Sequence, residues 1–223
     1  MTKVVTVKRR ALAANEERAE RLRARFAASG TLVANLISSP GSGKTTLLEA
    51  TVRALDGELT TAVIEGDVAT ENDADRIRAL GVPAHQILTG GACHLDARLV
   101  ETGIEDGGLP EVDILFIENV GNLICPTTYD LGEDFKVVLL SVAEGDDKPV
   151  KYPAIFARAE VAVVTKSDLL PHVPFELDSV KSQIASLNPN GTVLVTSSLQ
   201  GDGLDEWLDL LRARLQAKRQ SRG

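Results

Sequence analysis

A short loop rich in glycine and serine places the strongest constraint on the fold of this chain. Residues 38–46 read Ser-Ser-Pro-Gly-Ser-Gly-Lys-Thr-Thr and directly follow an apolar run at 32–37. They fit the phosphate-loop pattern G-x-x-x-x-G-K-[ST], except that Ser38 stands in place of the first glycine. An ordinary Gly/Ser turn is the less favoured interpretation, because a strand-like segment precedes the loop and a lysine follows it. The order strand, glycine loop, helix predicts a site for a nucleoside triphosphate.

The residue types in this loop suit separate tasks in phosphate binding. Gly41 and Gly43 allow backbone N–H groups to turn inward around an anion. The Lys44 side chain can reach the β- and γ-phosphates, and the Thr45 hydroxyl can hold Mg²⁺. The helix that follows adds its positive end to the same site. We therefore predict nucleotide binding by Gly41, Ser42, Gly43, Lys44, Thr45 and Thr46.

The rest of the chain alternates strand-like and helix-like segments. Strands are predicted at 32–37, 59–64, 85–88, 113–117, 136–142, 161–164 and 192–195. This alternation predicts an α/β fold of the P-loop NTPase type, with a mostly parallel sheet and helices on both faces. At 223 residues and 43% apolar content, one core is expected. We predict an amino-terminal flanking helix within 1–30 and a single nucleotide-binding domain at 31–223.

Charge and apolar patterning exclude several classes of partner. The net charge of −8 argues against a nucleic-acid-binding face, which needs basic residues to neutralise phosphates. No apolar run approaches the roughly 20 residues that span a bilayer. The basic start of the chain lacks the apolar segment of an export signal. We expect a cytoplasmic protein that binds neither nucleic acid nor membrane.

A lysine and an aspartate near the end of a late strand indicate which base is bound. The segment 165–168 reads Thr-Lys-Ser-Asp and is similar to the guanine motif N-K-x-D, with Thr165 in place of asparagine. The Asp168 carboxylate can accept two hydrogen bonds from guanine that adenine cannot supply, while the Lys166 stem covers the ring. A chance Lys/Asp pair is the alternative. Together with the Thr-Ser-Ser segment around Ser197, the pattern favours GTP and GDP over adenine nucleotides.

Acidic residues at two strand ends suit a magnesium ion. Asp67 and Glu118 each follow an apolar strand, and ligands in open α/β sheets bind at such ends. Mg²⁺ keeps several waters and needs few carboxylates, so Thr45, Asp67 and Glu118 form a sufficient set. Gly121 is placed to sense a γ-phosphate. Catalysis is assigned to Lys44, Thr45, Asp67 and Glu118, and slow hydrolysis is expected because no residue that positions the attacking water is evident.

The two cysteines of the chain lie on separate loops. Cys93 is followed by His94 after a glycine pair, and Cys125 precedes a proline. Thiolates with an imidazole suit Ni²⁺ or Zn²⁺. Buried, inert cysteines are the alternative. Because both loops leave strand ends that face the predicted nucleotide, we favour a shared metal site.

Five segments form a recognisable combination: 39–45, 65–67, 90–96, 118–126 and 144–147. The most specific of them contains Glu-Asn-Val-Gly-Asn-Leu-Ile-Cys-Pro. Together they resemble the HypB family, the hydrogenase-maturation GTPases of the SIMIBI class of P-loop proteins, and the resemblance covers nearly the whole chain.

The resemblance implies a biochemical role. It implies GTP at the phosphate loop and a Ni²⁺ or Zn²⁺ site at Cys93, His94 and Cys125, located at the interface of a homodimer. The resemblance also implies that Lys151 reaches the guanine bound to the partner subunit. Expected partners are a HypA-type nickel chaperone and the precursor of the [NiFe]-hydrogenase large subunit, into which nickel is inserted.

Two alternatives stay open at this point. A urease-type nickel-maturation GTPase has a similar architecture, but its Cys-Pro-His metal motif is absent here. A metal-binding scaffold whose dimerisation is controlled by nucleotide is the second. The chain also lacks an amino-terminal Cys-rich motif and a His-rich stretch, which argues against a second tight site or nickel storage. Since Cys125 lies four residues beyond Gly121, we expect nucleotide state to change metal affinity.

Overall fold

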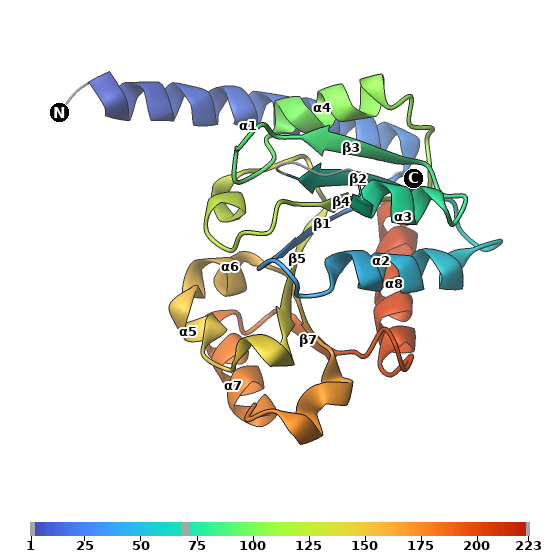
Figure 1. Ribbon diagram of the computed structural model, residues 1–223. Helices are drawn as coiled ribbons and strands as arrows, with labels where there is room; N and C mark the ends of the chain where they lie inside the picture. Colours follow the sequence, from blue (N-terminus) through green and yellow to red (C-terminus); the bar gives the residue numbers. More distant parts are fainter. Residues whose placement is uncertain (1–2, 68–71, 222–223) are drawn as a thin grey trace.

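The computed structural model describes residues 3–67 and 72–221, which form a central β-sheet covered by helices (Figure 1). Within these residues the sheet has seven strands in the order β3-β2-β4-β1-β5-β6-β7, all paired in parallel. The predicted α/β class is confirmed. The strands are β1 (Leu32–Ser38), β2 (Thr61–Asp67), β3 (Ala84–Leu88), β4 (Ile114–Glu118), β5 (Phe135–Ser141), β6 (Val161–Thr165) and β7 (Thr192–Val195).

Helices connect these strands, and short 3-10 turns occur in three of the loops. The α-helices are α1 (Lys3–Ser29), α2 (Lys44–Leu55), α3 (Asn72–Arg78), α4 (Ala97–Asp106), α5 (Lys148–Lys151), α6 (Pro153–Arg158), α7 (Leu177–Leu187) and α8 (Leu204–Gln220). The 3-10 turns are η1 (Cys125–Thr128), η2 (Val142–Glu144) and η3 (Ser167–His172). Among the described residues, no helix combines the length and the apolar character that crossing a membrane requires.

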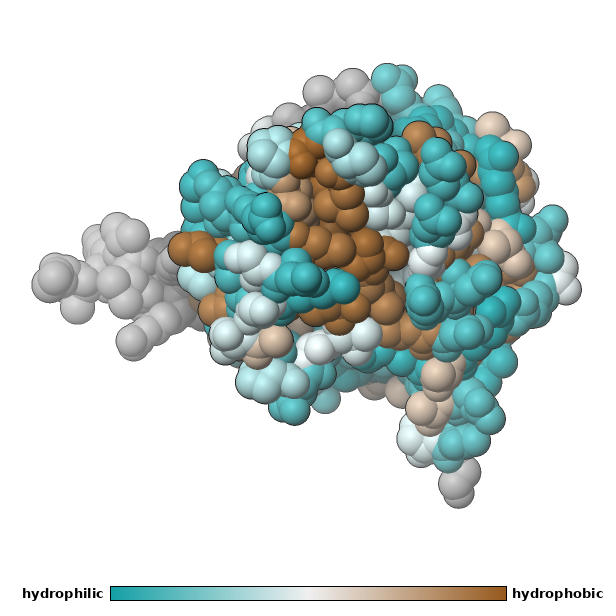
Figure 2. All heavy atoms as spheres, turned by 90° about the horizontal axis from the view of Figure 1, so that it is seen from below, coloured by the Kyte–Doolittle hydropathy of each residue, from teal (hydrophilic) through white to brown (hydrophobic). Residues whose placement is uncertain are grey.

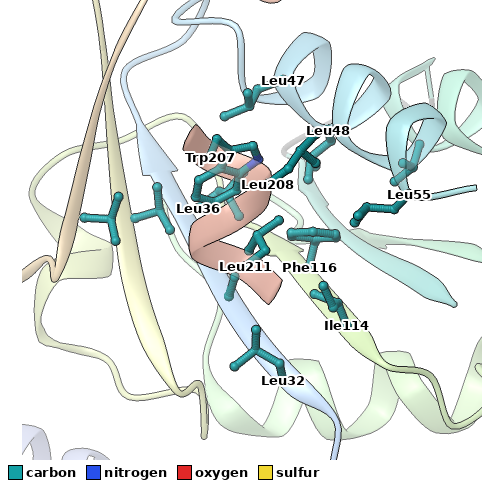
Figure 3. Packing of buried hydrophobic residues seen from close by; sticks show 14 of the residues in the cluster. Leu32, Leu36, Leu47, Leu48, Leu55, Ile114, Phe116, Trp207, Leu208 and Leu211 are labelled. Atoms are coloured by element: carbon teal, nitrogen blue, oxygen red, sulfur yellow. The ribbon is translucent and has the colours of Figure 1, made fainter. Parts of the chain in front are cut away.

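The core lies on both faces of the sheet. On one face, Leu36 of β1 and Phe116 of β4 join an apolar cluster with α2 and α8, in which Trp207 is fully buried (Figure 3). The Trp207 indole donates a hydrogen bond to the Thr51 hydroxyl of α2 at 2.9 Å. Fully burying a large apolar side chain stabilises the fold by about 1.5–3 kcal/mol. On the other face, α1 and α4 cover β2 and β4, while α6 and α7 cover β5 and β6.

Helix α1 packs on the same sheet as the rest of the chain. Its Leu22 and Phe26 are buried and share an apolar cluster with Val33 of β1 and Leu115 of β4. The predicted amino-terminal helix therefore has one buried side. Figure 1 shows α1 lying next to α4 across one end of the sheet.

Strand β2 extends further than its apolar run predicts. The prediction ended the strand at residue 64, before the first carboxylate, but the ladder continues to Asp67. Glu65 pairs in register with Glu118 of β4, and Asp67 pairs with Leu88 of β3. Backbone pairing on both sides holds this acidic end in the sheet. As a result, two glutamates lie side by side where β2 and β4 end.

Because all strands are parallel, their carboxyl ends meet at one edge of the sheet, where ligands bind in such folds. Predicted site residues lie at the end of β2 and in the loops after β1, β3, β4, β6 and β7. At the end of the molecule formed by α5, α7 and η3, apolar side chains gather in a band between polar ones (Figure 2). Partly buried apolar side chains at this end include Leu169, Leu170, Val173 and Leu177.

Candidate functional site

The loop between β1 and α2 has the geometry of an anion-binding turn. Gly41 and Gly43 have φ angles of 77° and 90°, in the left-handed region that side chains rarely adopt. Gly43 directly precedes α2, so the loop and the helix N-terminus border one cavity of about 440 Å³. The predicted site residues that line this cavity are Gly41, Gly43, Lys44, Thr45, Thr46, Asp67, Glu118, Gly121 and Lys166.

Ser38, which replaces the first glycine of the phosphate-loop pattern, contacts the loop lysine. Its buried Oγ accepts a hydrogen bond from Lys44 Nζ at 3.0 Å. Lys44 Nζ also lies 3.7 Å from Glu118 Oε1. The serine therefore helps to hold the ammonium group at the cavity, and the departure from the pattern has a structural use.

Carboxylate and hydroxyl oxygens meet beside the loop. The Thr45 hydroxyl donates to Glu118 Oε1 at 3.0 Å, and Asp67 lines the same cavity. Glu118 Oε2 is buried and has no hydrogen-bond partner within the described part of the chain. An orphaned carboxylate oxygen next to a hydroxyl and a second carboxylate fits a hard cation such as Mg²⁺.

Glu65 is a cavity residue that sequence reasoning passed over in favour of Asp67. It is buried next to Glu118, and its Oε1 also has no partner among the residues described. Burial and the adjacent Glu118 carboxylate raise the pKa of Glu65 to about 11. Burial likewise raises the pKa of Glu118, against the opposing effect of Lys44. The available sequence signal was a glutamate directly after each of two predicted strands, 59–64 and 113–117.

The predicted guanine motif lies where β6 and β7 end. The Ser197 hydroxyl donates to Asp168 Oδ1 at 2.6 Å, and the Ser167 N–H donates to the Thr196 carbonyl at 3.0 Å. These two bonds join the Thr-Lys-Ser-Asp segment to the Thr-Ser-Ser segment. The structure thus brings together the two stretches that the sequence assigns to one base.

Thr165 and Lys166 connect this motif to the phosphate loop. The Thr165 hydroxyl, in the position of the usual asparagine, donates to the Ser42 carbonyl at 2.6 Å. Lys166 Nζ donates to the Gly41 carbonyl at 2.8 Å. Lys166 has a φ of 59°, the one positive value outside glycine in the described residues. The lysine stem lies against the phosphate loop, and Lys166 lines the cavity beside it.

The segment after β5 supports the loop from another side. Glu144 Oε2 accepts from the Ser42 hydroxyl at 2.6 Å, and the Lys148 ammonium lies 3.5 Å from Glu144 Oε1. Lys151, in contrast, is exposed, pairs with Asp147 and does not line the cavity of its own chain. Its predicted reach to a second subunit stays a prediction.

The two cysteine loops meet near the same sheet edge. The ligand atoms of Cys93, His94 and Cys125 all lie within 4.8 Å of one another. Cys93 Sγ is 2.7 Å from Cys125 Sγ and 3.6 Å from His94 Nδ1. The hydrogen bond with Cys125 raises the pKa of the Cys93 thiol, and burial lowers the pKa of His94, whose ring lies against Tyr129. Two sulfur atoms and a neutral imidazole suit Ni²⁺ or Zn²⁺.

Asparagine side chains hold these loops together, a role that sequence reasoning missed. Asn122 Nδ2 donates to the Cys93 carbonyl at 3.3 Å, and Asn122 Oδ1 accepts from the Cys125 N–H at 3.4 Å. Asn119 Oδ1 accepts from the Leu95 N–H at 3.2 Å. The signal in the sequence is the presence of two amides within five residues of the end of the predicted strand at 113–117.

Comparison with known proteins identifies the family. Residues 32–195 match the nucleotide-binding domain of the CobW/HypB/UreG family. The chain is 50% identical over 200 residues to the hydrogenase maturation factor HypB of Escherichia coli, covering 90% of this chain and 69% of that protein. The HypB structure from Archaeoglobus fulgidus superposes with a TM-score of 0.86 at 39% identity, covering 92% of this chain and all of that one. The chain belongs to the HypB family of hydrogenase maturation factors.

A further HypB structure adds a metal to the comparison. HypB from Helicobacter pylori, solved in complex with nickel, superposes with a TM-score of 0.85 at 41% identity, covering 93% of this chain and 96% of that one. The match to the hydrogenase maturation factors of Escherichia coli and Archaeoglobus fulgidus favours the hydrogenase-maturation assignment over the urease-type alternative. The resemblance drawn from the five sequence segments is confirmed.

Proposed function

We propose that this HypB-family chain is a GTP-hydrolysing metallochaperone that binds nickel and assists its insertion into the large subunit of a [NiFe]-hydrogenase. One observation carries the proposal: a single segment, 118–125, borders both sites. Glu118 contacts Thr45 at the nucleotide cavity, and Cys125 contacts Cys93 in the metal cluster. Between them, a side chain at Gly121 would lie 2.9 Å from Pro40 of the phosphate loop.

The cavity residues support GTP hydrolysis by positioning and charge neutralisation. Thr45, Asp67 and Glu118 would hold Mg²⁺, which neutralises charge on the transferred phosphoryl group. Lys44 is already oriented at the cavity by Ser38. Asp168, fixed by Ser197, would select guanine. With no residue assigned to orient the attacking water, slow turnover is expected.

The metal cluster supports a homodimer. Cys93, His94 and Cys125 supply three ligand atoms, and a second copy facing the first would complete the coordination. Ile124, next to Cys125, and Val150, next to Lys151, are large apolar side chains that are two-thirds exposed. We propose that these side chains are buried between the two copies, and that Lys151 of one copy contacts the guanine of the other.

We propose that the transfer of nickel takes place in the cytoplasm. A HypA-type nickel chaperone would exchange metal with the cluster, and the hydrogenase large-subunit precursor would receive it. Nickel is preferred to zinc as the cargo because the Helicobacter pylori relative was solved in complex with nickel. Zinc fits the same donor atoms and is the competing ion.

A nickel titration tests the coupling. The reduced, metal-free protein is titrated with Ni²⁺ in the presence of GDP and then of a non-hydrolysable GTP analogue, and the series is repeated with Cys125→Ala. Affinities should differ by about 5- to 150-fold between the nucleotides in the wild type, the usual range of allosteric coupling, and become equal in the variant. Equal wild-type affinities would contradict a GTP-gated nickel donor. Multiple turnover of GTP that depends on Thr45 would separately exclude a scaffold whose nucleotide controls dimerisation alone.

A further inference from the structure

One buried amide joins the nucleotide cavity to the loop that carries Cys93 and His94, which we call the metal loop. Asn119 follows Glu118 at the end of β4, lines the cavity and is 1% exposed. Its Oδ1 accepts hydrogen bonds from the N–H groups of Leu95, at 3.2 Å, and Val120, at 3.0 Å. Leu95 is the residue after His94. A single side chain therefore connects the segment that touches the phosphate loop with the loop that carries two metal ligands.

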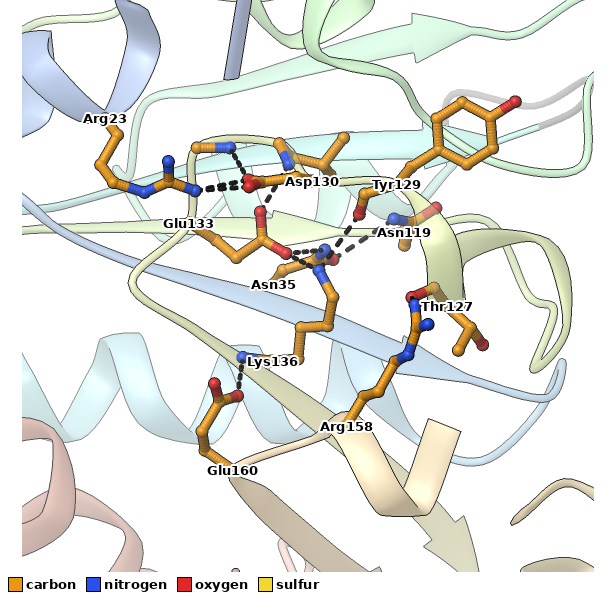
Figure 4. A network of polar contacts seen from close by, with 12 residues as sticks. Arg23, Asn35, Asn119, Thr127, Tyr129, Asp130, Glu133, Lys136, Arg158 and Glu160 are labelled. Atoms are coloured by element: carbon orange, nitrogen blue, oxygen red, sulfur yellow. Dashed lines mark hydrogen bonds and ion pairs between the residues drawn. The ribbon is translucent and has the colours of Figure 1, made fainter. Parts of the chain in front are cut away.

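The other end of the same amide leads to a network of polar contacts that includes Asn35, Glu133 and Lys136 (Figure 4). Asn119 Nδ2 donates to Asn35 Oδ1 at 3.3 Å, and Asn35 Nδ2 donates to Glu133 Oε1 at 3.2 Å. Lys136 pairs with Glu133 and donates to the Tyr129 carbonyl at 3.1 Å. All four side chains of this route are buried or nearly so.

This second route returns to the metal cluster. The ring of Tyr129 lies 3.9 Å from the ring of His94, centroid to centroid, at an interplanar angle of 31°. His94 is thus restrained through its backbone neighbour Leu95 and through its own ring. Asn119 is the residue common to both restraints, while Asn35 belongs only to the second.

We propose that Asn119 is the positioning residue that transmits nucleotide state to the metal loop, through its hydrogen bond to the Leu95 N–H. This inference rests on the proposed coupling between GTP and nickel. A buried N–H without an acceptor is unfavourable. When a triphosphate shifts the segment around Gly121, the metal loop must therefore follow Asn119 or lose its acceptor.

Three variants separate the direct bond from the network. Asn119→Ala removes both routes, Asn35→Ala removes only the second, and Asn119→Asp keeps an oxygen that can accept from Leu95. Each reduced variant is titrated with Ni²⁺ under GDP and under the non-hydrolysable GTP analogue. The ratio of the two affinities should fall to within twofold of unity in Asn119→Ala. It should stay within twofold of the wild-type ratio in Asn35→Ala and in Asn119→Asp.

The outcomes distinguish this inference from the proposed function. A wild-type ratio that survives in Asn119→Ala, or that is lost equally in Asn119→Ala and Asn35→Ala, overturns the role of Asn119 while the coupling stands. If the wild-type protein binds nickel with equal affinity under both nucleotides, the proposed coupling and the role of Asn119 are both contradicted. GDP affinity and thermal unfolding are measured for every variant. Should Asn119→Ala fail to fold, Asn119→Asp decides, because loss of its nucleotide response overturns the inference.

Discussion

The phosphate loop and the metal loop lie at the same edge of the sheet, but different interactions hold them. Ser42, Lys44 and Thr45 are buried, and two glycines with positive φ set the path of the loop. In the metal loop, Cys93 is exposed and depends on amide side chains from a distant segment. The first site is determined by local chain geometry, and the second by tertiary contacts. Substitutions in one loop should therefore change the binding of its own ligand, nucleotide or nickel, more than that of the other.

The largest effect is expected at Lys44. Lys44→Ala should lower kcat/KM for GTP by at least about 100-fold, because one preorganised charge at a developing phosphoryl charge has about that effect. Nickel affinity under saturating GDP should stay within threefold of the wild type. Phosphate release and nickel titration measure the two effects, with exposed Lys181→Ala as the matched control. A fall of less than tenfold would remove Lys44 from the catalytic set.

Glu65, which lines the nucleotide cavity, leads to a prediction about how the stability of the protein depends on pH. Its pKa of about 11 lies above the unfolded value of 4.5, so the folded state binds the extra proton between these pH values. The contribution of Glu65 to the free energy of unfolding is complete below pH 4.5 and is lost as the pH rises toward 11. Wild-type stability relative to Glu65→Gln should therefore fall between pH 5 and 8, by at most about 1.4 kcal/mol per pH unit.

Urea unfolding at pH 5, 6.5 and 8 measures this difference. Glu17→Gln, at an exposed position on α1, is the control and should show no pH trend relative to wild type. Parallel pH profiles for wild type and Glu65→Gln would show that Glu65 is ionised in the folded protein.

A substitution at Asn122 tests the predicted metal site separately from the nucleotide cavity. Asn122→Ala removes hydrogen bonds to the Cys93 carbonyl and to the N–H groups of Ile124 and Cys125. Nickel affinity should fall about tenfold or more, because loss of the hydrogen-bond partners that orient metal ligands typically lowers metal affinity about 10- to 100-fold. GDP affinity, measured by calorimetry, should stay within twofold. Exposed Asn190→Ala is the control, and an equal loss of GDP affinity would show that the two loops do not behave separately.

The smallest effect is expected at Thr165. Thr165→Val removes the hydroxyl that donates to the Ser42 carbonyl, and GDP affinity should fall about three- to tenfold. Thr165→Ser keeps the donor and should restore binding. A serine variant as weak as the valine variant would assign the effect to packing of the methyl group.

Most of the fold follows from local pattern. Each apolar run predicts a strand because strands buried on both faces carry few polar residues. The end of β2 is the exception. Glu65 and Asp67 look like loop residues in one dimension, but β3 and β4 pair with the backbone on either side. Carboxylates inside a strand become interpretable only when the neighbouring strands are known.

The residues of the site also fall into two groups, those predictable from local sequence and those whose contacts depend on the fold. Lys44 and Thr45 are predictable because the phosphate-loop pattern is contiguous, and Cys93 and Cys125 because thiols are rare in this chain. The contacts of Asn119 depend on the path of a segment 24 residues away. Thr165 could be recognised as a substitution in a known motif, but its bond to Ser42 spans 123 residues. Such contacts can be predicted only when the fold is known.

Trp207 also gives the molecule a built-in optical reporter. It is the single tryptophan of the chain, and its indole N–H is bonded to Thr51 on the helix that begins at the phosphate loop. Indole emission responds to changes in polarity and hydrogen bonding. Movements of α2 during nucleotide exchange should therefore be visible in the intrinsic fluorescence of the unlabelled protein, in real time.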